Sequence, residues 1–233
     1  MKIAIMQPYF FPYIGYFQLI NSVDKFVVYD DIEYTKKGWI NRNRFLMNGC
    51  DFLFSIPLKK DSDLLNVNKR FLADNYPDHK KKVLGQISSS YAKSPQFKTI
   101  FPIIEECLNF ENYNLFFFIH NSLNKICNYL DIKTEFIISS TLAINPDLKG
   151  ENKVLEINKK LNSNIYINAI GGQELYSREK FLNNNIELKF IKTNPIIYTQ
   201  FNNEFIPFLS IIDVMMFNSK EEIKKHLDSY TFV

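Results

Sequence analysis

The stretch KIAIMQPYFFPYIGYFQLINSVDKFVVYD, residues 2–30, decides the class of fold that the sequence predicts. It begins with a short apolar run, Lys2–Met6, of the kind that forms a buried strand. Two prolines interrupt any helix after this run, and residues 14–23 then show a helical pattern. Residues 25–29 are a second run of β-branched and aromatic side chains. A strand, a loop, a helix and a strand within about 30 residues predict a parallel βαβ unit.

The last third of the chain shows the same alternation of strand-like and helical patterns. Its strand-like runs are residues 135–139, 165–170 and 186–191. Between the two alternating parts, apolar residues recur at helical spacing, most clearly over residues 114–130. We therefore predict an α/β fold, a Rossmann-like parallel sheet with helices on both faces. It forms a single domain over residues 1–233, with a largely helical insertion at about residues 65–130.

The composition is ordinary for a soluble globular protein, with 46% hydrophobic and 23% charged residues. A net charge of +3 is too small to indicate nucleic-acid binding. No apolar run approaches the roughly 20 residues of a membrane helix, and no signal-peptide pattern precedes the first strand. Cysteine and histidine spacings match no metal motif. We expect a cytoplasmic chain without a metal site, nucleic-acid partner or stable membrane insertion.

The loop of residues 7–15 follows the first predicted strand, where ligands of parallel sheets usually bind. Gly15 at the start of a helix permits close approach of a phosphate to the backbone. The segment PYIGYFQLI, residues 12–20, resembles the HIGH-type segment of nucleotidylyltransferases, with tyrosines in place of histidines. Tyrosine carries no positive charge near neutral pH, which disfavours adenylyl transfer through an imidazole. The alternative is that these aromatic residues belong to the core and that Gly15 only makes a turn.

The segment DDIEYTKKGWINRNRF, residues 30–45, is the richest polar stretch and follows the second predicted strand. Its carboxylates can act as a general base or bind sugar hydroxyls, and its basic side chains can bind phosphates. Trp39 and Tyr34 can stack on a base or on a sugar face. His79 opens a predicted helix and can act as an acid or a base. The alternatives are a solvated loop of mixed charge and a histidine on the surface.

Together these segments resemble the WbqC-like family. The resemblance rests on residues 6–20, residues 24–45, HKKKVLGQISSSYAKSPQF (residues 79–97) and FIPFLSIIDVMMFN (residues 205–218). It implies a bacterial cytoplasmic protein of O-antigen, capsule or related surface-polysaccharide synthesis, which decorates an activated amino sugar by acyl or aminoacyl transfer. The family varies at the position before Tyr34, so Glu33 is a weaker candidate than Asp30 or Asp31. The positions of the family motif in this chain are Gln7, Tyr9, Pro12, Gly15, Tyr16, Asp30, Asp31, Tyr34, Lys36, Trp39, Asn41, Arg42, Asn43, His79 and Tyr91.

The leading hypothesis is a transferase that N-acylates a nucleotide-linked amino sugar. Its predicted catalytic residues are Asp30, Asp31 and His79, which could deprotonate the amine. Lys36 and Arg42 are expected to hold the diphosphate. The predicted substrate-binding residues are Gln7, Tyr9, Tyr13, Gly15, Tyr16, Tyr34, Lys36, Trp39, Asn41, Arg42 and Asn43.

The cofactor is not identified by the sequence, and an acyl-CoA or another activated acyl donor is the expectation. The sequence leaves homo-oligomerisation open. Two rival hypotheses remain. One is nucleotidyl transfer or adenylate formation by a degenerate HIGH-like loop. The other is a non-catalytic carbohydrate-binding component of a glycan assembly complex.

Overall fold

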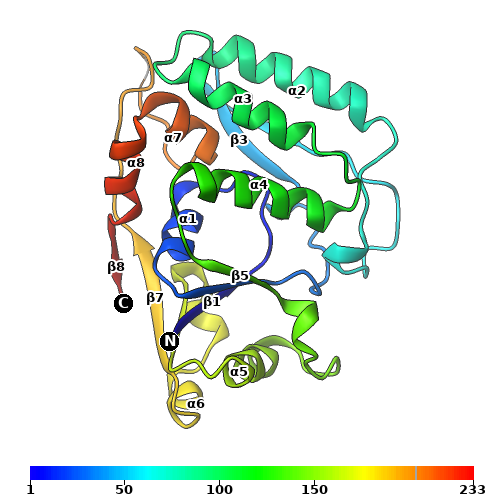
Figure 1. Cartoon of the computed structure of the whole chain (residues 1–233), viewed down its shortest axis with the longest axis vertical. Coiled ribbons are helices and arrows are strands. Elements are labelled where there is room, and N and C mark those ends of the chain that lie inside the picture. Colours follow the sequence, from blue (N-terminus) through cyan, green and yellow to red (C-terminus); the bar gives the residue numbers. More distant parts are fainter. Residues whose placement is uncertain (203) are drawn as a thin grey trace.

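Six strands pair into one sheet in the computed structural model, which describes residues 1–202 and 204–233 (Figure 1). The spatial order is β5–β2–β1–β6–β7–β8. The first five strands in this order run parallel, and β8 pairs antiparallel to β7 at the edge. The strands are β1 (Lys2–Met6), β2 (Lys25–Val28), β5 (Glu135–Ile138), β6 (Ile165–Ala169), β7 (Glu187–Thr193) and β8 (Tyr230–Phe232). The chain order reverses at β1, which lies between β2 and β6, so the sheet has a switch point there.

Helices cover both faces of the sheet, as β1 shows residue by residue. Ala4 packs into a core cluster on one face, whereas Ile3 and Ile5 pack into a second cluster on the other face. Both clusters are needed because a central parallel strand is buried on both sides. The first face carries α1 (Ile14–Asn21), α4 (Leu115–Tyr129), α7 (Ile211–Phe217) and α8 (Lys220–Leu227), and the second carries α5 (Gly150–Lys160) and α6 (Arg178–Leu182). The predicted Rossmann-like α/β fold is confirmed.

The chain between β2 and β5 ends in α4, which packs on the sheet, and its earlier elements build a layer beyond α4 (Figure 1). It begins with an antiparallel hairpin in which Phe45 pairs with Phe52. Three α-helices follow, and the second of them, α3, contains Pro102. The elements are β3 (Arg42–Met47), β4 (Cys50–Ser55), the 3-10 helix η1 (Val67–Lys69), α2 (Tyr76–Tyr91), α3 (Phe97–Leu108) and α4. The hairpin precedes the segment of residues 65–130 that was predicted as largely helical.

The hairpin holds the loop that follows β1 in place. Asn43 is buried and its amide Nδ2 donates hydrogen bonds to the carbonyl oxygens of Phe10 and Phe11, at 3.2 and 2.8 Å. The Ser210 hydroxyl donates to the same Phe11 carbonyl at 2.8 Å. Phe11 has a positive φ of 43°, which is costly for an aromatic residue. Its conformation therefore depends on partners from the hairpin and from the residue that caps α7.

A buried carboxylate joins the outer layer to the C-terminal helices. Asp213 on α7 accepts hydrogen bonds from the hydroxyls of Tyr91 and Tyr198, at 2.7 and 2.6 Å, and from Nε2 of Gln200 at 2.7 Å. The Tyr91 hydroxyl also accepts the backbone N–H of Leu46 at 2.8 Å. Burial raises the pKa of the Asp213 carboxyl. This network ties α2, α7 and the hairpin into one unit.

Replacing Asn43 by alanine should destabilise the protein, because the Phe10 carbonyl loses its buried donor and the Phe11 carbonyl keeps only the Ser210 hydroxyl. We expect Asn43→Ala to lower the free energy of unfolding by about 2–3 kcal/mol, measured by urea denaturation. Asn183→Ala is the matched control, because Asn183 is exposed. Equal urea midpoints for the two variants would show that the loop does not depend on Asn43.

Asp213→Asn should also destabilise the fold, because an amide donor then faces three other donors. The expected loss at neutral pH is about 1–3 kcal/mol. Because the folded state raises the pKa of Asp213, the stability that its proton contributes is complete below the unfolded-state pKa and is lost as pH rises through the folded-state pKa. The difference in unfolding free energy between wild type and variant should therefore be wider near pH 4 than near pH 8. The reverse trend would contradict this reasoning, and Glu111→Gln, at an exposed position, is the control.

Candidate functional site

A cleft of about 1070 Å³ opens at the carboxyl ends of β1, β2 and β6. Its walls come from the loops after these strands and from the first turns of α5. A smaller hollow of about 510 Å³ lies between the α2–α3 connection and α8. Ligands of open α/β sheets bind at the switch point, outside the carboxyl ends of the strands. The larger cleft is at that point and is therefore the candidate site.

The loop after β1 forms one wall of the cleft, as its position in the sequence predicts. The cleft-lining residues of this segment include Gln7, Tyr9, Tyr13, Gly15 and Tyr16. The Tyr16 hydroxyl donates to the backbone oxygen of Gln7 at 2.8 Å, and the Tyr9 hydroxyl donates to the Gln7 side chain at 3.3 Å. Burial raises the pKa of Tyr9 and of Tyr13. Both tyrosines therefore offer the cleft neutral hydroxyl groups.

Gly15 gives space to an aromatic ring. A Cβ atom at this position would collide with the ring of Tyr13, which folds over the start of α1. The Tyr13 ring in turn lies 6.3 Å from the ring of Phe208, which is exposed. Gly15 thus leaves room for the Tyr13 side chain of its own loop, at the position where a phosphate could approach the backbone.

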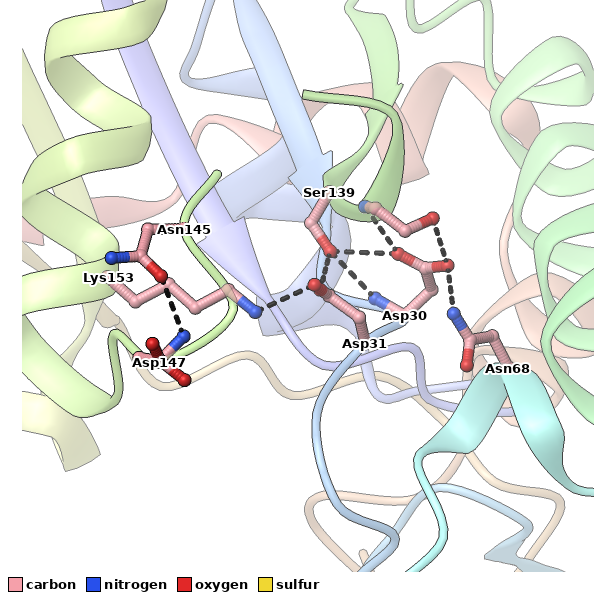
Figure 2. A network of polar contacts seen from close by, with 8 residues as sticks. Asp30, Asp31, Asn68, Ser139, Asn145, Asp147 and Lys153 are labelled. Carbon is pink, nitrogen blue, oxygen red and sulfur yellow. Dashed lines mark hydrogen bonds and ion pairs between the residues drawn. The ribbon is translucent and has the colours of Figure 1, made fainter. Parts of the chain in front are cut away.

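Asp30 is buried, with 2% of its surface exposed, and both of its carboxylate oxygens are hydrogen-bonded (Figure 2). Oδ1 accepts the Ser139 hydroxyl at 2.8 Å and the Ser140 backbone N–H at 2.9 Å. Oδ2 accepts the Ser140 hydroxyl at 2.7 Å and Nδ2 of Asn68 at 2.8 Å. Asp30 is not among the residues that line the cleft. Its contacts make it an anchor that joins the end of β2 to the segments after β5 and at η1.

Asp31 lines the cleft and is only partly buried. Its Oδ1 accepts a short hydrogen bond from the Ser139 hydroxyl, and its Oδ2 pairs with the ammonium of Lys153 at 2.7 Å (Figure 2). Ser139 has a single hydroxyl proton, so it can donate to only one of the two neighbouring aspartates at a time. Because Asp31 lines the cleft and Asp30 does not, Asp31 is the one of the two predicted aspartates that can meet a ligand.

Lys153 was not predicted as a site residue. It lies in the first turns of α5, 6% exposed, and its ammonium sits 5.0 Å from the centre of the Tyr29 ring. In the sequence it stands beside the apolar stripe of α5, without a motif, and 122 residues from Asp31. The contact between these two side chains exists only because the end of β2 and the start of α5 meet at the carboxyl ends of the parallel strands.

Other parts of the cleft come from the segments after β5 and β6. A Cβ atom on Gly172 would lie 2.8 Å from Nδ2 of Asn168, so this glycine allows a close approach of two chain segments. Glu151 pairs with Lys180 at 2.8 Å. The cleft residues of these segments that sequence reasoning missed include Lys149, Glu151, Lys153, Asn168 and Tyr176.

Trp39 and its basic neighbours form a separate group outside the cleft lining. Trp39 is 41% exposed, and the guanidinium groups of Arg42 and Arg44 each lie 5.6 Å from its ring. Arg42 also donates to the carbonyl oxygens of Gly38 and Lys37. The structure thus separates the predicted stacking residue and the predicted phosphate ligand from the Asp31 cleft, and their roles in binding stay predictions.

The remaining predicted residues are also outside the cleft lining. Lys36 is exposed and pairs with Asp63 at 2.9 Å. The Tyr34 hydroxyl donates to the Asn41 side chain at 2.7 Å, and the Asn41 amide donates to a backbone oxygen of the hairpin. His79 lies half-buried on α2, and its Nε2 has no hydrogen-bond partner among the described residues. The structure does not place these side chains in the wall of the cleft, and their functional roles stay predictions.

Two further findings concern the described part of the chain as a whole. Among residues 1–202 and 204–233, no three histidine, cysteine, aspartate or glutamate side chains cluster as metal ligands do. In the same residues, no helix has the length and apolar character to cross a membrane.

Comparison with known proteins identifies the family. Residues 7–225 match the model of the WbqC-like protein family. "Uncharacterized protein Rv1507c" of Mycobacterium tuberculosis is 32% identical over 134 residues, which span 57% of this chain and 58% of that protein. No solved structure matches the chain. The family model covers nearly the whole sequence and includes the opening loop, Asp31 and Lys153, so the chain belongs to the WbqC-like protein family.

Proposed function

We propose that the protein is a cytoplasmic transferase that acylates the amino group of a nucleotide-linked amino sugar for a bacterial surface polysaccharide. The observation that carries this proposal is the Asp31 carboxylate in a cleft of about 1070 Å³ at the switch point of the sheet. Pockets for small ligands usually measure about 300–1,000 Å³, so a cleft of this size suits a nucleotide joined to a sugar. The family membership supports the substrate class.

Asp31 supplies the proton acceptor that N-acylation requires. The nitrogen lone pair of the amino sugar attacks the acyl carbonyl carbon, and a new C–N bond forms. The bond from this carbon to the leaving group breaks, and the leaving group keeps the electron pair. Asp31 attracts the substrate ammonium, which orients it toward the acyl donor, and accepts the proton whose loss frees the nitrogen lone pair for the attack. The second nitrogen proton is lost as the amide forms and goes to the leaving group, which departs as its conjugate acid.

Asp30 and Ser139 keep Asp31 in position for this step. Asp30 is fixed by Ser140 and Asn68, and it holds the Ser139 hydroxyl within reach of Asp31. The sequence suggested an acid-base role for both aspartates, but in this proposal the two have different roles. Asp30 is a positioning residue because it faces away from the ligand, and Asp31 is the catalytic residue.

The opening loop favours acyl transfer over nucleotidyl transfer. In a HIGH-like loop the glycine must approach the nucleotide phosphate, but here the end of the Tyr13 side chain lies against Gly15. The neutral hydroxyls of Tyr9 and Tyr13 suit the hydroxyl groups of a sugar better than they suit an anion. The loop therefore fits the sugar part of the proposed substrate.

The proposal predicts a covalent product. The wild-type protein is incubated with a panel of nucleotide-linked amino sugars and acyl-CoA, acyl-carrier or aminoacyl donors, and mass spectrometry follows the mass of the sugar nucleotide. We expect the mass of one acyl group to be added to at least one acceptor. Asp31→Asn should reduce the rate by about 10²–10⁴-fold, because the proton acceptor is lost.

Glu156→Gln is the control, because Glu156 lies on α5 but outside the cleft lining. No added mass with any donor, from a folded protein, would contradict acyl transfer. Release of pyrophosphate from a nucleoside triphosphate would instead support nucleotidyl transfer. An Asp31→Asn variant that binds and reacts like the wild type would remove Asp31 from the mechanism.

A further inference from the structure

We propose that Lys153 is the anion-binding residue of the cleft. Its ammonium is paired with Asp31 until a phosphate group of the substrate displaces the Asp31 carboxylate. The inference deepens the proposed function, because the anion that fits is the diphosphate of a nucleotide-linked substrate. It makes diphosphate binding the event that releases the catalytic carboxylate.

The surroundings of Lys153 are those of a binding group. Lysine is almost never fully buried without a partner, and here the partner is another cleft residue. An ammonium can donate three hydrogen bonds, and Asp31 is its single hydrogen-bond partner within residues 1–202 and 204–233. The Tyr29 ring, 5.0 Å away, stabilises the charge without using a donor. Lys153 therefore has unused donors at the wall of a large cleft.

The other basic side chains near the cleft are less suited to a buried anion. Lys180 is already bound by Glu151 and by the Asn152 side chain, at 2.8 and 2.6 Å. Lys149 lines the cleft but is exposed, so its charge is screened by solvent. Lys36 and Arg42, which the sequence suggested as diphosphate ligands, are outside the lining. Lys153 is the cation that combines burial with a place in the cleft.

Asp31 can release Lys153 because its second oxygen has a partner of its own. Oδ1 faces the Ser139 hydroxyl, which lies within reach of both aspartates. When Ser139 donates to Asp31, Asp30 keeps the hydrogen bonds from Ser140 and Asn68. The Ser139 proton therefore compensates Asp31 for the loss of Lys153, and no buried carboxylate is left without a donor.

The exchange has a consequence for the reaction. When Lys153 binds the diphosphate, the Asp31 oxygen that held its ammonium is free to meet the amino group of the substrate. In the empty cleft the ion pair keeps the same carboxylate occupied.

The test uses inorganic pyrophosphate as the probe and isothermal titration calorimetry of the full chain at low, fixed ionic strength. If Asp31 competes with the anion for Lys153, Asp31→Asn should bind pyrophosphate at least about 5-fold more tightly than wild type. Lys153→Met should bind it at least about 10-fold more weakly. In the double variant the gain from Asp31→Asn should disappear, because the gain acts through Lys153.

Three controls isolate this competition. Glu33→Gln removes another carboxylate of the cleft and measures the general effect of charge, which should be smaller than that of Asp31→Asn. Lys159→Met removes an exposed lysine of the same helix and should leave binding unchanged. Lys153→Arg keeps the positive charge and should retain binding of pyrophosphate, and circular dichroism checks that each variant is folded.

Two results would overturn the inference. Weaker binding by Asp31→Asn, equal to that of Lys153→Met, would show that the ion pair is structural. Equal binding by wild type and Lys153→Met would show that the anion site lies elsewhere. Pyrophosphate binding needs no acyl donor, so failure of the acylation assay leaves this result intact, and failure of pyrophosphate binding leaves acyl transfer open.

Discussion

The candidate site depends on one buried negative charge. Removing a carboxylate from water is costly unless hydrogen bonds replace the lost solvation, and Asp30 obtains them from three residues on two separate segments. Those donors, Ser139, Ser140 and Asn68, can reach Asp30 only if the end of β5 and η1 both close over the end of β2. The charge of Asp30 therefore fixes three chain segments at the carboxyl ends of the strands.

The role proposed for the neighbouring Asp31 depends on this arrangement. Figure 2 shows the Asp30 carboxylate turned toward Asn68 and the Asp31 carboxylate turned toward Lys153. Asp31 lines the cleft, whereas Asp30 does not. The Ser139 hydroxyl lies between the two, so a group held rigidly by the first aspartate also reaches the second. A side chain built on fixed neighbours keeps its position while its partner at the other oxygen changes.

The sequence predicted the five parallel strands of the sheet because these depend on local patterns, but it did not predict the short edge strand β8. The apolar runs of β1 and β2 and the stripe of α4 are visible without any tertiary contact. The sequence also placed Asp31 at a strand end, where sites of this fold lie. It could not reveal Lys153, because a single lysine on an amphipathic helix has no local signature. Nor could it separate Trp39 from the Asp31 cleft, because the packing of Trp39 against Arg42 and Arg44 is a tertiary contact.

The charge balance of the cleft limits what it can bind. Asp31 is paired with Lys153 and Glu151 with Lys180, so two of its acidic residues already hold a cation in the empty state. An anion that takes Lys153 leaves Asp31 with the Ser139 hydroxyl as a donor but without an opposite charge, which limits the affinity of a ligand of one sign. A ligand that carries both signs can replace each half of the Asp31–Lys153 pair at once. An amino sugar with a diphosphate is such a ligand, since its ammonium can meet Asp31 while its phosphates meet Lys153.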